Sequence, residues 1–182
     1  MSLVRRILTG LLCVLFCSAF LAAQNSAAVP TKLLDHLTGS WVLQGTIAGK
    51  QTTHDIHATW VLNREYVQLH EISREKDASG AAAYEAIVYL SWDVKPQQYS
   101  CLWLDSTAGG GLSAEGIARA NLAGDSIPLI FTISPSDQIH TTFTYDKGAD
   151  TWRWLIDDVE SGRTQRFANV MLTRAKPDSP QP

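Results

Sequence analysis

The sequence predicts an all-β protein: a ten-stranded antiparallel up-and-down barrel preceded by a short helical turn. Three observations lead to this prediction. Apolar and polar residues alternate with a period of two over most of the chain after residue 40, as they do in half-buried strands. Short segments with turn chemistry separate the alternating runs. A meander of such strands has two unpaired edges, and closure into a barrel removes them. A two-sheet sandwich is the alternative.

The first residues have the pattern of an export signal. Arg5 and Arg6 precede an uncharged apolar run that ends in small residues, as a signal peptidase requires. We therefore expect residues 1–23 to be removed, residues 24–31 to be flexible, and the mature protein to be periplasmic or secreted, with no membrane span. A retained N-terminal anchor is the alternative, because the apolar run with its flanks approaches the length of a membrane span.

The barrel domain is expected to cover residues 32–174, followed by a disordered, proline-rich tail over 175–182. A leucine-rich helical turn over 32–37 is stopped by Gly39. The expected strands cover residues 41–47, 54–62, 65–73, 82–93, 98–106, 113–121, 127–133, 138–146, 151–158 and 164–173. Asn63-Arg64, Lys147-Gly148 and Ser161-Gly162 are typical of the tight turns between them.

Charge and cysteine content exclude two classes of protein. The chain has a net charge of −3, and removal of the two signal arginines makes the mature charge about −5. Because phosphate binding needs a basic face, a nucleic acid partner is not expected. Two of the three cysteines lie in the signal, which leaves Cys101 without a disulfide partner. Cys101 is expected to be a buried, inert thiol, and the domain must be stabilised by its core.

Several short motifs, in this order along the chain, resemble those of lipocalin-like barrels. They are Gly39-Ser40-Trp41, Trp60-Val61-Leu62, the run from Tyr84 to Asp93, Tyr99 with Trp103 and Asp105, and Val170-Met171-Leu172-Thr173-Arg174. This order resembles a bacterial lipocalin-like (calycin-type) domain family of unknown function. The resemblance implies that Trp41 plugs one end of a barrel, and it implies no activity.

The same opening motif also resembles nitrobindin, a ten-stranded haem barrel whose iron ligand is a histidine near the end of the chain. Here the last histidine is His140, and the final strand, Arg166-Phe167-Ala168-Asn169-Val170, contains none. Haem is therefore not expected, and no other cofactor is implied.

Two histidines are the candidates for a polar or metal-assisted site. If Asn63-Arg64 forms a two-residue hairpin loop, His57 lies directly across from His70 on the neighbouring strand. Their imidazoles could then share a metal or act as acid and base, although no third ligand can be named. The opposite face of these strands is the more apolar one, which favours a solvated pair. His54 lies on the face opposite to His57, so these two cannot chelate together.

The aromatic residues are the candidates for a ligand-binding lumen. Tyr84 and Trp92 share one strand face, Tyr99 and Trp103 share another, and Arg119 is a candidate polar contact. Plain core packing is the alternative for all of them. Because no catalytic motif occurs, we expect a non-catalytic binding protein that holds a small apolar or amphipathic ligand. The alternatives are an enzyme that uses His57 and His70, and a structural or interaction module with a filled barrel.

Overall fold

The structure, a computed structural model, describes residues 29–107 and 111–176. One α-helix, ten strands and a short 3₁₀ helix follow one another along the chain. They are α1 (Val29–Leu37), β1 (Gly39–Ile47), β2 (Lys50–Val61), β3 (Tyr66–Ser73), β4 (Glu85–Asp93), β5 (Gln98–Asp105), η1 (Ala114–Gly116), β6 (Ile117–Asn121), β7 (Ser126–Ser134), β8 (Asp137–Asp146), β9 (Thr151–Glu160) and β10 (Arg163–Arg174).

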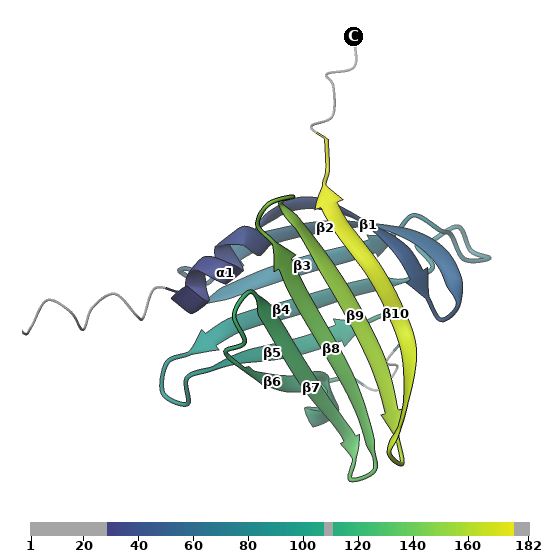
Figure 1. Ribbon diagram of the computed structural model, residues 1–182. Coiled ribbons are helices and arrows are strands. Elements are labelled where there is room, and N and C mark those ends of the chain that lie inside the picture. The colour runs from purple at the N-terminus through teal and green to yellow at the C-terminus, as the bar shows by residue number, and fades with distance from the viewer. Residues whose placement is uncertain (1–28, 108–110, 177–182) are drawn as a thin grey trace, which may run out of the picture.

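The strands form the closed antiparallel barrel that the sequence predicts, drawn in Figure 1. Each strand pairs with the next along the chain, and β1 closes the barrel by pairing with β10, where Trp41 lies opposite Arg174. No strand is left at an edge, so the sandwich alternative is wrong. The residues of the expected signal and most of the expected tail lie outside the described part of the chain.

The structure corrects three predicted boundaries. The helix begins at Val29, inside the segment that was expected to be flexible. The strand expected at 82–93 begins only at Glu85, because the preceding residues form a small loop with a single bridge between Lys76 and Ala82. The strand expected at 113–121 begins at Ile117, because the hydroxyl of Ser113 accepts a hydrogen bond from the backbone N–H of Glu115 and starts a 3₁₀ turn.

Alternate residues of each strand face the barrel interior, and the largest of them fill the half of the barrel beside α1. Trp41, Tyr99 and Trp152 are fully buried there. Leu34 and Leu37 of α1 belong to the same buried cluster. We call this end the closed end, because α1 covers it (Figure 1).

Side chains from both ends of the barrel domain hold α1 in place. The indole N–H of Trp41 donates to the carbonyl of Leu37 at 2.7 Å, which satisfies one of the free carbonyls at the helix end. The Arg174 guanidinium donates to the carbonyls of Thr38 and His36, and it lies 3.7 Å from the ring centroid of Trp41. Within residues 29–107 and 111–176, no helix is long and apolar enough to cross a bilayer.

Candidate binding site at the open end of the barrel

Four of the five residues predicted to line a lumen face the barrel interior. Trp92 and Trp103 pack against the core, Tyr99 is fully buried, and Tyr84 stacks on the interior His54 ring at 5.8 Å. Arg119 is the exception, and its prediction is corrected. It is exposed on β6, between the buried Ala118 and Ala120, and it therefore points away from the interior.

The four interior aromatics lie at two different ends. Trp92 and Tyr99 contact each other edge to face at 4.9 Å near α1, where Trp92 also borders a small depression of about 170 Å³. Tyr84 and Trp103 lie at the opposite end, which α1 does not cover and which we call the open end; there the indole N–H of Trp103 donates to the Tyr84 hydroxyl at 3.3 Å. The predicted residues thus form two separate groups, and only the second can meet a ligand that enters at the open end.

A buried histidine and a buried glutamate form the centre of the open end. His54 of β2 is 5% exposed and Glu71 of β3 is 2% exposed, and both face the interior. The Nδ1 atom of His54 lies 2.5 Å from Oε1 of Glu71. A buried carboxylate is tolerated only when it is hydrogen-bonded or paired, and this contact supplies the partner.

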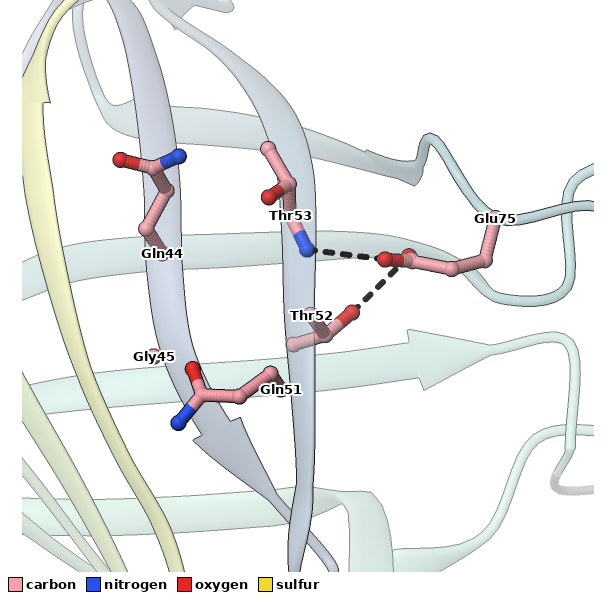
Figure 2. A pocket seen from close by; sticks show the side chains of 6 residues that line it. All are labelled: Gln44, Gly45, Gln51, Thr52, Thr53 and Glu75. Atoms are coloured by element: carbon pink, nitrogen blue, oxygen red, sulfur yellow. Dashed lines mark hydrogen bonds between the residues drawn. The ribbon is translucent and has the colours of Figure 1, made fainter.

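Glu75 connects this pair with the outer surface. Its carboxylate accepts hydrogen bonds from the hydroxyls of Ser73 and Thr52, at 2.6 and 2.9 Å, and from the backbone N–H of Thr53. Figure 2 shows Glu75 reaching Thr52 and Thr53 across a shallow, mainly polar depression of about 450 Å³, which Gln44 and Gln51 border on the other side. The hydrogen bond from Ser73, with the smaller contributions of the other donors, lowers the pKa of Glu75 to about 2.

The ionised Glu75 determines the direction of the remaining hydrogen bonds. Because the Thr52 hydroxyl donates its single proton to Glu75, its oxygen must accept from Nε2 of His54, which lies 2.8 Å away. His54 therefore donates from Nε2, and its Nδ1 atom is hydrogen-bonded with Glu71. Both ring nitrogens are engaged, so His54 presents neither of them to a molecule in the barrel.

Aromatic rings continue from this polar cluster into the middle of the barrel. Trp103 lies 5.2 Å from Trp154, which stacks on Phe143 at 4.7 Å. Burial and the nearby negative charges of Glu71 and Asp105 raise the pKa of Tyr84, whose hydroxyl therefore stays neutral and able to donate. The open end thus combines a neutral hydroxyl and a hydrogen-bonded acid with aromatic surface.

His57 and His70 lie opposite each other as the hairpin register predicts, but on the outer face of the barrel. His57 contacts the Ser40 hydroxyl at 3.1 Å, and His70 contacts Glu85 at 2.6 Å. No group of three or more histidine, cysteine, aspartate or glutamate residues in the described chain could hold a metal ion. This placement removes the interior site that the pair suggested and confirms the solvated alternative.

The histidines of the chain do not fit a haem iron. The interior of β10 has no histidine, and His54, which does face the interior, has both ring nitrogens within hydrogen-bonding distance of Glu71 and Thr52. The other four histidines lie on α1 or on the outer face of the barrel.

His54 and Glu71 are the interior polar residues that the sequence reasoning did not identify. The signal was available, because His54 has the same parity as Ile56 and Ala58, and Glu71 has the same parity as Val67 and Leu69. The register that pairs His57 with His70 also brings these two inward-facing positions together. A polar residue in an apolar strand face is thus the informative pattern here.

These features define a closed, ten-stranded antiparallel β-barrel with a short N-terminal helix. Among solved structures, the chain is similar to the crystal structure of Rv2717c from M. tuberculosis, with a TM-score of 0.53 and 14% sequence identity. The match covers 81% of this chain and 98% of that one. No protein-family model matches the chain, and no curated protein matches it. The similarity therefore shows the fold alone, and the resemblance to lipocalin-like barrels holds at that level.

Proposed function

We propose that this protein is an exported, non-catalytic binding protein that holds a small, mainly apolar ligand in the open half of its barrel. The observation that carries this proposal is the exposure of interior side chains at the open end. Trp103, Ile139 and Ile156 pack against the core, yet each remains partly accessible to solvent. Apolar side chains that line the inside of a barrel mouth, with a few polar groups beside them, are typical of small-molecule sites.

The chemistry of the site favours binding over catalysis. The ring nitrogens of His54 are both occupied, and the pKa of Tyr84 is raised. Burial also raises the pKa of the Cys101 thiol, which keeps it protonated and unreactive. An enzyme needs a base or nucleophile that faces its substrate, and none of these three groups offers one, whereas the neutral Tyr84 hydroxyl is suited to donate a hydrogen bond.

Titration with N-phenyl-1-naphthylamine, a neutral fluorescent probe, tests the proposal. We expect saturable binding that Trp103→Phe weakens about fivefold or more, the equivalent of one aromatic contact. Trp92→Phe is the matched control, because Trp92 is also a partly exposed interior tryptophan but lies at the closed end. Its binding should stay within about twofold of the unaltered protein.

Two results would contradict this proposal. Absence of saturable binding would favour the alternative of a structural or interaction module whose barrel is filled. The complete burial of Trp41, Tyr99 and Trp152 is consistent with that alternative. Weaker binding in Trp92→Phe with no change in Trp103→Phe would place the ligand at the closed end.

Export rests on a separate observation, the arginine pair and apolar run within residues 1–23. Fractionation of producing cells and N-terminal sequencing of the purified protein test it. We expect the mature chain outside the cytoplasm, beginning near Gln24. A chain that stays bound to the membrane with residues 1–23 intact would support the retained anchor instead.

A further inference from the structure

Trp154 has a buried hydrogen-bond donor without an acceptor. The residue is 3% exposed on β9, faces the barrel interior, and its Nε1 atom has no hydrogen-bond partner among the described residues. By contrast, the indole N–H groups of Trp41, Trp60, Trp103 and Trp152 all donate to named oxygen atoms. Because leaving a buried donor unpaired costs stability, an unpaired one in a binding protein calls for an explanation.

The position of Trp154 places this donor below the candidate site. Its ring stacks on Phe143 and lies 5.2 Å from Trp103, whose other side is partly accessible from the open end. A molecule that enters at the open end therefore meets Trp103 first and Trp154 next. Trp103 makes a long hydrogen bond to Tyr84, at 3.3 Å, and its ring contacts Phe131 edge to face at 6.2 Å, so this ring must turn for the ligand to reach Trp154.

The charges around this path indicate what kind of acceptor the donor takes. The buried polar residues of the described chain are His54, Glu71, Ser73 and Thr141, and no lysine or arginine is among them. Among these buried residues an anionic ligand would find no unpaired cation, because His54 is already paired with Glu71, and it would lie near the carboxylate of Asp105. A neutral acceptor, such as a carbonyl oxygen, has neither penalty.

We propose that the ligand carries an uncharged carbonyl-type oxygen that accepts a hydrogen bond from Nε1 of Trp154, while its apolar body packs against the Trp103 ring. This inference rests on the proposed function and adds the chemical class of the ligand: a small, neutral, predominantly apolar ketone, lactone or amide.

Three probes of similar size separate the contributions: 1-tetralone, which has the carbonyl; tetralin, which lacks it; and 1-naphthoate, which is anionic. We expect 1-tetralone to bind about fivefold to tenfold more tightly than tetralin, the effect of one hydrogen bond, and 1-naphthoate to bind most weakly. Trp154→Phe should remove the advantage of 1-tetralone and leave tetralin unchanged. Trp92→Phe is the control that keeps the donor.

The indole resonance of Trp154 in a ¹⁵N–¹H spectrum, assigned by its loss in Trp154→Phe, gives a second readout. We expect this resonance to shift on saturation with 1-tetralone and to change much less with tetralin. If tetralin and 1-tetralone bind equally well, or if the resonance stays in place, the ligand class is wrong while the binding function stands. If neither compound nor the fluorescent probe binds, both proposals are wrong.

Discussion

Glu71 and His54 form a buried pair in which each residue depends on the other. Removing one partner of such a pair leaves an uncompensated polar group and typically costs about 3 kcal/mol or more. The same pair could be replaced by apolar residues with little loss of stability, so stability alone does not account for its presence in the interior. The His54 ring also stacks on Tyr84 at 5.8 Å, so the pair contacts an interior tyrosine of the open end.

Glu75 makes the stability of the open end depend on pH. Its pKa is lowered from 4.5 to about 2, so the ionised side chain stabilises the folded state above about pH 4.5, and this contribution is lost as the pH falls towards 2. We expect Glu75→Gln to reduce the loss of melting temperature between these two pH values. The effect will be small, because the side chain is 47% exposed and its interactions are screened by water.

Glu65→Gln is the control for this measurement, since Glu65 is an exposed carboxylate in the β2–β3 loop. Melting temperatures of the three proteins would be compared by circular dichroism over the same pH range. Parallel curves for Glu75→Gln and the unaltered protein would show that the contacts of Glu75 with Ser73 and Thr52 add nothing to stability.

At the scale of single residues, sequence reasoning succeeded where a strand face is uniform and failed where it is mixed. Tyr99 and Trp103 lie among apolar neighbours, so their inward direction followed from alternation. The strand of Arg119 is short, and its small alanines gave too little contrast to show which face is buried. The His54–Glu71 contact needs two strands in register, and that information is only implicit in the sequence.

At the scale of elements, α1 is held by the last residue of the last strand. Arg174 donates to two carbonyls at the end of α1, pairs with Asp150 at 2.9 Å and stacks on Trp41. These contacts also explain why a nine-residue helix, too short to be stable alone, is formed here. The sequence showed the leucines of α1 but not that the helix begins at Val29.

Arg174→Met tests this attachment, because methionine keeps an apolar side chain and removes the guanidinium. We expect a loss of about 2 kcal/mol in the free energy of unfolding, together with faster hydrogen exchange of the α1 amides. Arg153→Met is the control, since Arg153 is exposed on β9 and has a weak contact of 3.4 Å with Asn169. Equal urea midpoints for the two variants would contradict a special role for Arg174.

At the scale of the whole molecule, α1 covers one end of the barrel, and three of the largest fully buried side chains fill the interior beside it. The ten-strand order and the antiparallel pairing followed from alternation and turn chemistry. The sequence did not predict which half of the barrel the large side chains fill, because this depends on how side chains from different strands meet. Trp41, Tyr99 and Trp152 come from the ends of three strands that only the closed topology brings together.

Closure of the barrel depends on Gly45, at which β1 passes very close to β10. A Cβ atom at this position would lie 2.4 Å from the carbonyl oxygen of Asn169 and 2.8 Å from the Cα atom of Val170, and its φ is +148°. We expect Gly45→Ala to destabilise the protein by about 3 kcal/mol, because backbone atoms of β10 must move.

Gly49→Ala is the matched control, since Gly49 also has a positive φ, of +76°, but no atom lies within 4 Å of the added Cβ. Its cost should be about 1 kcal/mol, from backbone conformation alone. Urea unfolding of both variants gives the comparison. Equal costs would show that the contact between β1 and β10 is easily adjusted.

The pairing of β1 with β10 also orders events while the chain is being made. A chain leaving a ribosome or a translocon cannot close its barrel until Arg174 has emerged, because the first strand pairs with the last. Until then β1 and the newest strand both present unpaired backbone groups, which can pair with other nascent chains. The pairing of β1 with β10 joins residues that are far apart in the sequence, and such contacts predict slow folding. Synthesis of this barrel therefore includes a period of aggregation risk that ends only with the final strand.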